Sequence, residues 1–166
     1  NKVPSEINKN HLIQKVLDIL NPSLNSSNIE VIKNIDDFEF VTIENDLIQI
    51  LMNIITNAKD ALIDLKDEEA RYIFINISKN QKNIVIEIFD NAMGIKDEII
   101  SRVFEPYFTT KHKSQGTGIG LYMSKILVDN NLKGNIAVEN HTFIYNNKEF
   151  KGAKFIILLP IKLEKK

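Results

Sequence analysis

Apolar residues recur every three or four positions between residues 44 and 64, which predicts a long helix with one wide buried face. Polar residues at similar spacing form a stripe along this helix, and its members are Asp46, Gln49, Asn53, Asn57, Asp60 and Asp64. The stripe either faces water or lines a polar pocket. Asn53 and Asn57 favour the pocket, because asparagine is a poor helix former and its amide oxygen is a suitable ligand for a hard cation such as Mg²⁺.

The same kinds of pattern predict the elements on either side. Residues 10–20 have helical spacing, and we expect that helix to end at Asn21-Pro22. Alternating apolar and β-branched residues predict strands, and these cover residues 29–35, 38–43, 72–78 and 84–89. The last two strands are close enough in the chain to form a hairpin.

After Asp90 the pattern breaks up, and residues 96–115 form a long connection of the kind that serves as a lid. A helix is expected from Gly116 to about Asn130. Strands over residues 136–139 and 154–159 then close the chain, with a polar hairpin loop between them. Three main helices and about five strands without strict βαβ alternation predict an α+β fold. We expect a two-layer sandwich, in which three helices cover one face of a mixed sheet.

Composition narrows the class of protein. The 166 residues are 43% hydrophobic and 26% charged, which suits one compact domain with a full core. A net charge of −1 argues against nucleic-acid binding, and the absence of cysteine excludes disulfides and thiolate metal sites. No apolar run is long enough to span a bilayer and no signal peptide is evident. We expect a cytoplasmic location for this chain, whether or not the full-length protein has a membrane anchor. Residues 1–8 are expected to be a linker from an upstream domain, and residues 9–166 the folded domain.

Asp90 stands at a strand end, just before Asn91-Ala92-Met93-Gly94-Ile95. Its carboxylate either closes an ordinary Asx turn or accepts a hydrogen bond from an exocyclic amine, such as N6 of adenine. In the second case Gly94 lets the backbone pass close to the ring.

Gly116 to Gly120 have the spacing GxGxG at the start of a helix. A dinucleotide-binding fold is disfavoured, because no strand leads directly into the motif and no acidic residue follows at the required distance. The segment is either a structural loop or an anion site suited to phosphates. The aromatic residues of FEPYF before it either close over the core or contact a ligand or partner.

Together and in order, these segments resemble the ATP-binding catalytic domain of sensor histidine kinases, within the gyrase, chaperone, kinase and mismatch-repair (GHKL) ATPase superfamily. NIITNAKDAL is similar to the family's N box, DNAMGI to its first glycine box, FEPYF to its F box, GTGIGL to its second glycine box, and GAKF to its last glycine motif. The resemblance implies a Bergerat-type sandwich that binds ATP and Mg²⁺ beneath a mobile lid.

The resemblance also implies roles for single residues. It assigns Mg²⁺ to Asn57, phosphate-side contacts to Asn53, and adenine recognition to Asp90 with Gly94. Further nucleotide contacts are implied for Asp60, Ile95, Phe104, Gly116, Thr117, Gly118, Ile119, Gly120 and Leu121. Many members carry a lid arginine that holds the γ-phosphate, and Lys111 is the candidate that replaces it here.

Two positions depart from related patterns. The family usually has glycine where this chain has Ala92, so the turn there must avoid a positive φ or tolerate strain. ATP-hydrolysing members of the superfamily have a glutamate general base where this chain has Asn53. An amide cannot take that proton, which favours a kinase over a GHKL-type ATPase. An anti-sigma serine kinase and an interaction module without catalysis are the alternatives.

A kinase of this family implies partners outside the chain. None of His11, His112 and His141 is followed by the acidic residue that usually follows a phosphoacceptor histidine. We therefore expect the acceptor on an upstream dimerisation domain, and a response regulator receiver domain as the next recipient. The full-length protein is expected to be a homodimer and this chain alone a monomer.

Overall fold

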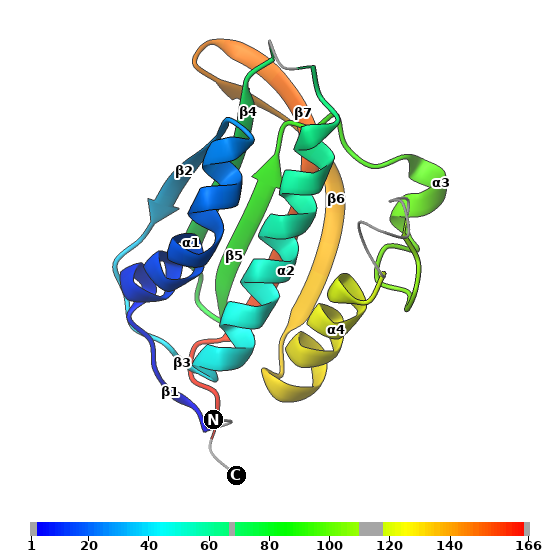
Figure 1. Ribbon diagram of the computed structural model, residues 1–166. Helices are drawn as coiled ribbons and strands as arrows, with labels where there is room; N and C mark the ends of the chain where they lie inside the picture. The colour runs from blue at the N-terminus through cyan, green and yellow to red at the C-terminus, as the bar shows by residue number, and fades with distance from the viewer. Residues whose placement is uncertain (1–2, 67–68, 110–117, 165–166) are drawn as a thin grey trace.

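The computed structural model describes residues 3–66, 69–109 and 118–164, and it arranges them in two layers (Figure 1). One layer is a five-stranded sheet with the order β2-β4-β5-β7-β6. Its strands are β2 (Ile29–Ile35), β4 (Arg71–Lys79), β5 (Asn83–Asp90), β7 (Lys148–Pro160) and β6 (Asn135–Tyr145). The pair β2–β4 is parallel and the three other pairs are antiparallel. The predicted α+β sandwich with a mixed five-stranded sheet is therefore confirmed.

The helical layer covers one face of this sheet (Figure 1). It consists of α1 (Lys9–Ser26), α2 (Glu44–Ile63) and α4 (Gly120–Ile126), which continues as the π-helical segment η1 (Leu127–Asn131). The short helix α3 (Asp97–Ile100) lies to one side of the layer. The three predicted main helices are confirmed. Among the described residues, no helix is both long and apolar enough to cross a bilayer.

The expected end of the first helix at Asn21-Pro22 is wrong, because α1 continues through Pro22 to Ser26. Proline removes only its own backbone donor, and the turn that follows it is held by packing. Leu24 in that turn is 1% exposed, and Ser23 Oγ accepts a hydrogen bond of 2.9 Å from Lys59 Nζ on α2. The burial of Leu24 and this bond to α2 both hold the last turn of α1 in place.

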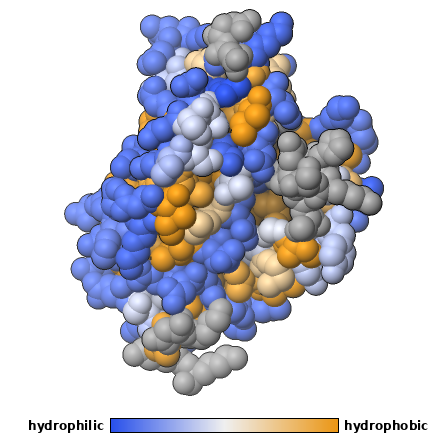
Figure 2. Space-filling view, in the orientation of Figure 1, coloured by the Kyte–Doolittle hydropathy of each residue, from blue (hydrophilic) through white to orange (hydrophobic). Residues whose placement is uncertain are grey.

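The main core lies between the two layers. Alternate residues of β4 and β5 face the helices, and those with no exposed surface are Ile73, Ile75, Ile77, Ile84 and Ile86. The apolar stripe of α2 packs onto them and leaves Leu47, Ile50, Leu51, Ile54 and Ile55 equally inaccessible. On the outer surface, hydrophobic atoms gather between α1 and α2 and over α4 (Figure 2).

The hairpin of β6 and β7 is much longer than predicted. The expected polar loop is wrong, because the strands pair as far as Tyr145 and Lys148 and turn through Asn146 and Asn147 alone. Both asparagines have positive φ (51° and 63°), as a type I′ turn requires. On the face of the sheet away from the helices, aromatic rings of the hairpin meet rings of β4 and β5; this cluster contains Tyr72, Phe74, Phe89, His141, Phe143, Tyr145 and Phe150.

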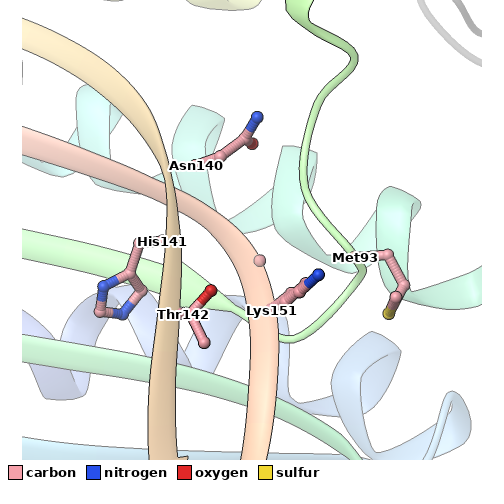
Figure 3. A pocket seen from close by; sticks show the side chains of 6 residues that line it. Met93, Asn140, His141, Thr142 and Lys151 are labelled. Atoms are coloured by element: carbon pink, nitrogen blue, oxygen red, sulfur yellow. The ribbon is translucent and has the colours of Figure 1, made fainter.

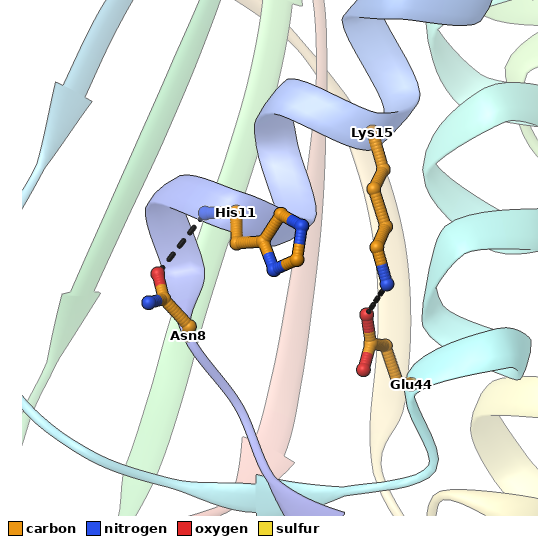
Figure 4. A network of polar contacts seen from close by, with 4 residues as sticks. All are labelled: Asn8, His11, Lys15 and Glu44. Atoms are coloured by element: carbon orange, nitrogen blue, oxygen red, sulfur yellow. Dashed lines mark hydrogen bonds and ion pairs between the residues drawn. The ribbon is translucent and has the colours of Figure 1, made fainter.

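The N-terminal residues take part in the fold. Strand β1 (Ser5–Glu6) pairs antiparallel with β3 (Val41–Thr42), and Ile7 is 3% exposed. The Asn8 side chain caps α1 by accepting a bond of 3.0 Å from the His11 backbone, and Lys15 bridges to Glu44 at the start of α2 at 2.8 Å (Figure 4). Residues 5–8 therefore pack on the folded domain. Their connection to an upstream domain stays a prediction.

Arg71 joins the ends of the two long helices. It is 8% exposed, and its guanidinium donates to Ser27 O after α1 at 2.7 Å. It also donates to Ile63 O at 3.2 Å and to Leu65 O at 2.8 Å, both at the C-terminal end of α2. These carbonyls have no partner within a helix, so a cation placed between them satisfies both ends at once.

We expect Arg71→Met to lower the free energy of unfolding by about 2–4 kcal/mol, because three part-buried hydrogen bonds from a charged donor are lost. Urea unfolding followed by circular dichroism measures this value. Arg102→Met is the matched control, since Arg102 is exposed and its contacts, an ion pair with Glu105 and a stacking contact with Phe108, are local. That change should cost less than about 1 kcal/mol. Equal effects of the two substitutions would contradict the role of Arg71.

Candidate functional site

Asp90 lies at the end of the central strand β5 and is only 3% exposed. Its Oδ1 accepts hydrogen bonds from Ala92 N at 2.9 Å and Ala153 N at 3.3 Å. Burial raises the pKa of the Asp90 carboxyl to about 6, against the opposing effect of these two bonds. Close packing against β7 requires glycine at position 152, where a Cβ atom would lie 1.7 Å from Asp90 O.

The loop after Asp90 contains two residues with positive φ, Met93 (74°) and Gly94 (89°). Ala92 is not among the residues with positive φ, so the departure from the family's glycine is accommodated without strain at that position. The left-handed conformation falls on Met93 instead. A side chain at Gly94 would be strained, because φ is 89° and its Cβ would lie 2.6 Å from Asn140 Oδ1, which would have to move.

The first half of the polar stripe on α2 holds the neighbouring helix in place. Asp46 is 3% exposed and accepts a bond of 3.0 Å from Asn131 in η1. The Asn53 amide nitrogen donates to Gly120 O and to Ser124 Oγ in α4, each at 3.1 Å. Asn53 thus ties α2 to the helix that follows the second glycine box.

The second half of the stripe makes no hydrogen bond to α4 among the described residues. Asn57 is half-buried, and no described residue makes a hydrogen bond with its side-chain amide. It lies one helical turn beyond Asn53, past the bonds to α4. Asp60 is also half-buried, and its carboxylate lies 3.9 Å from Lys59 Nζ. The sequence assigned both residues to the nucleotide site, and this placement is compatible with that assignment.

The second glycine box is described from Gly118 onward; Lys111, Gly116 and Thr117 lie outside the described residues. Gly118 O accepts a bond of 3.0 Å from Tyr107 N, so the F box and the glycine box are joined through their backbones. Ile119 precedes the first turn of α4, and Leu121 packs partly buried against the core.

Phe104 of the F box packs on the core. Its ring meets Phe155 edge-on with centroids 6.1 Å apart, while Tyr107 is 77% exposed. The interpretation of the aromatic residues as a patch that closes over the core therefore fits Phe104. A contact between Phe104 and nucleotide stays a prediction. A cavity of about 460 Å³ lies beside it; its lining is Ser101, Phe104, Glu105, Pro106, Tyr122, Lys125, Ile126 and Asp129.

Several residues that shape the site were missed at the level of sequence. Asn140 on β6 bonds both backbone groups of Ile95. Ser124 has no exposed surface and donates to Gly120 O at 2.9 Å. Asn91 binds Tyr72 N and Ala70 O and so fixes the start of β4. All of these bonds except that of Ser124 join segments that are distant in the sequence, so no local pattern predicts them. Ser124 follows the GxGxG motif, which was the only local indication of its role.

A cavity of about 290 Å³ lies beside the Asp90 loop (Figure 3). Its lining is Met93, Asn140, His141, Thr142, Lys151 and Gly152.

Within the described residues, no cluster of three or more acidic, histidine or cysteine side chains could hold a metal ion by itself. A cation held by Asn57 would therefore take most of its ligands from a bound molecule or from water. That coordination suits Mg²⁺, which usually keeps waters and binds substrate phosphates together with one or two side chains.

Comparison with known proteins places these features in a family. Residues 42–163 match the family model described as histidine kinase-, DNA gyrase B-, and HSP90-like ATPase. Sporulation kinase E of Bacillus subtilis is 31% identical over 154 residues, which are 91% of this chain and 19% of that protein. The nucleotide-free catalytic domain of histidine kinase ThkA superposes with a TM-score of 0.78 at 25% identity, over 96% of this chain and 99% of that domain.

A second structure of ThkA, in complex with response regulator protein TrrA, has a TM-score of 0.72 at 23% identity. The superposition covers 95% of this chain and 42% of the ThkA chain in that complex. The chain therefore spans a small part of its relative from B. subtilis and less than half of the longer ThkA chain, while it matches the separate ThkA catalytic domain over nearly its full length.

The raised pKa of Asp90 predicts how stability depends on pH. An unfolded chain ionises this carboxyl near pH 3.8, but the folded protein keeps it protonated up to about pH 6. The folded state then binds more protons between these values, so the contribution of Asp90 to stability is lost as the pH rises from about 4 to 6. Relative to Asp90→Asn, the wild-type protein should lose roughly 3 kcal/mol across this interval.

Urea unfolding of both proteins at a series of pH values measures the difference. The Asp90→Asn variant is the control that removes this titration and keeps the shape of the side chain. A constant difference between the two proteins from pH 4 to pH 7 would contradict the raised pKa.

Proposed function

Because the chain belongs to the histidine kinase-, DNA gyrase B- and HSP90-like ATPase family, we propose that it is the catalytic ATP-binding domain of a sensor histidine kinase. It binds Mg-ATP and transfers the γ-phosphate to a histidine on a separate dimerisation domain. A receiver domain of a response regulator then takes the phosphoryl group.

The main support for nucleotide binding is that only one of the two carboxyl oxygens of Asp90 accepts hydrogen bonds from described residues. Both hydrogen bonds to its buried carboxylate go to Oδ1. Among the described residues, no donor contacts Oδ2. Asp90 is only 3% exposed, and an exocyclic amine satisfies its Oδ2 while a carbonyl does not. Adenine presents such an amine, whereas guanine presents a carbonyl at the corresponding position.

Transfer to a protein rather than to water is supported by Asn53. Its amide nitrogen is held by Gly120 O and Ser124 Oγ, and its Oδ1 accepts a bond of 3.3 Å from Gln49. An amide in this position cannot remove a proton from water, and its contacts keep α4 against α2. This favours a kinase over a GHKL-type ATPase. The same fold without catalysis would be an interaction module, and nucleotide titration distinguishes it.

Asn57 is the proposed side-chain ligand of Mg²⁺, since its half-buried amide is free of other described partners. When bound, the ion neutralises charge on the phosphates. Asp60, Ile95, Phe104 and the backbone of the second glycine box are the further proposed contacts to nucleotide. Lys111 is the proposed cation for the γ-phosphate.

The proposed partners follow from the same assignment. The dimerisation and phosphoacceptor domain precedes this chain, and the full-length kinase is a homodimer while the isolated chain is a monomer. The structure of ThkA with response regulator TrrA supports a receiver domain as the partner of this class of protein. No nucleic-acid partner is proposed, because the net charge is −1. The domain itself is proposed to be cytoplasmic.

Titration with a fluorescent ATP analogue, with and without Mg²⁺, tests the nucleotide site. We expect Asn57→Ala to abolish the effect of Mg²⁺ on the dissociation constant, because the variant loses the proposed ligand and keeps the apolar face of α2. Asn45→Ala is the control: it removes an exposed asparagine amide from the same helix, twelve residues or about 18 Å away. Its affinity should stay within about twofold of the wild-type value.

If the wild-type chain binds no nucleotide in this titration, the interaction module is the correct alternative. If Asn57→Ala responds to Mg²⁺ as the wild type does, Asn57 is not the ligand and the nucleotide site itself still stands.

Phosphoryl transfer is tested with radiolabelled ATP. The chain alone should stay unlabelled, because the acceptor must be in line with the γ-phosphate and none of the three histidines resembles a phosphoacceptor. His11 is exposed near the start of α1, while burial and Lys154 lower the pKa of His141 within the aromatic cluster. Addition of the upstream helical segment should give label on that segment, and Asn57→Ala should prevent it. Phosphohistidine on this chain alone, located by mass spectrometry, would refute the proposed roles.

A further inference from the structure

The loop of residues 91–95 is attached at its C-terminal end to the β6–β7 hairpin. Asn140 Oδ1 accepts a hydrogen bond of 2.7 Å from Ile95 N, and Asn140 Nδ2 donates to Ile95 O at 2.6 Å. One amide side chain therefore pairs with both backbone groups of a single residue, as a neighbouring strand would. Asn140 lies on β6 beside the loop that carries Met93 (Figure 3).

A second contact with the hairpin holds the middle of the loop. Met93 N donates to Lys151 O on β7 at 3.0 Å. The start of the loop is held by Asp90, which binds Ala92 N. The five residues from 91 to 95 are thus attached at three points, and Asn140 is the contact supplied by a side chain from another element.

The attachment is needed because the loop has an unfavourable backbone. Met93 has a side chain and a φ of 74°, a conformation that costs an ordinary residue about 1–2 kcal/mol. Met93 is also 67% exposed, so burial of its side chain does not compensate for the strain. A strained residue persists only where its surroundings define the conformation, and the bonds on either side of Met93 do so.

We propose that Asn140 is a positioning residue for adenine binding, which fixes the loop from Asp90 to Ile95 in its binding conformation before the nucleotide arrives. The proposal rests on the proposed function, since it deepens the role of the adenine site. Asn140 packs closely on the backbone at Gly94, where an added Cβ atom would lie 2.6 Å from Asn140 Oδ1. We call the two bonds between Asn140 and Ile95 the clamp. Without the clamp, part of the free energy of nucleotide binding is spent on ordering the strained loop, and the affinity for nucleotide falls.

The first test measures the clamp without nucleotide. Hydrogen exchange should show a protected Ile95 amide in the wild-type chain, and at least tenfold faster exchange in Asn140→Ala. The amides of Ile75 and Ile86 in the central strands should be unchanged, which shows that the variant is folded. Unchanged exchange at Ile95 would overturn the clamp, whatever the protein binds.

The second test measures adenine binding with the fluorescent ATP analogue. Loss of two hydrogen bonds should raise the dissociation constant of Asn140→Ala about tenfold. Asn135→Ala is the matched control, because Asn135 is an exposed asparagine on the same strand. It should stay within about twofold of wild type. An unchanged dissociation constant for Asn140→Ala would overturn the proposal, whereas a wild-type chain that binds no nucleotide would refute the proposed function.

A double-mutant cycle with Met93→Gly separates positioning from a general loss of stability. Glycine adopts a positive φ without strain, so this change should restore the affinity of Asn140→Ala to within about threefold of wild type. In the wild-type background the same change should alter affinity by less than about twofold. Equal effects of Asn140→Ala in both backgrounds would overturn the compensation of strain at Met93.

Discussion

The buried carboxyl group of Asp90 is the constraint on which the arrangement around the sheet depends. A charge with 3% exposure is unfavourable unless donors surround it, and here the donors are backbone amides of two separate segments. Ala92 N can reach the carboxylate only if the chain turns at once after β5. Ala153 N can reach it only if β7 approaches closely, which the missing side chain of Gly152 permits. The end of the central strand, the turn after it and the path of β7 are therefore one structural unit.

Helix α2 places the second part of the site against this unit. Its apolar face belongs to the core, and its polar stripe has two different roles along its length. Asp46 and Asn53 bind the segment that contains α4 and η1, so the helix after the glycine box has a fixed position. Asn57, one turn later, is free of described partners and half-buried. The polar stripe thus divides into residues that contact the neighbouring helix and residues that are proposed to contact a ligand.

How far the sequence predicts this protein depends on the range of each interaction. The helix over residues 44–64 and the hairpin of β4 and β5 follow from local periodicity, and both are confirmed. The long β6–β7 hairpin was missed because its rings pack across strands that are distant in the chain. Asn140 was missed for the same reason, since it bonds a residue 45 positions away. The motif residues were identified through the family resemblance, while their partners could be found only in three dimensions.

Three locally unfavourable features of the described residues lie in or beside the same site. Asp90 is a buried acid with one oxygen lacking a described donor, Met93 has a left-handed backbone, and Asn57 is a half-buried amide without a described partner. Local preference would remove each of them, so the rigid sheet and α2 must hold them in place. A nucleotide with its cation would satisfy Asp90 and Asn57 in the folded protein and offers nothing comparable to the unfolded chain. Binding must therefore stabilise the fold, and most strongly at the end of β5 and the second half of α2, where these unsatisfied groups lie.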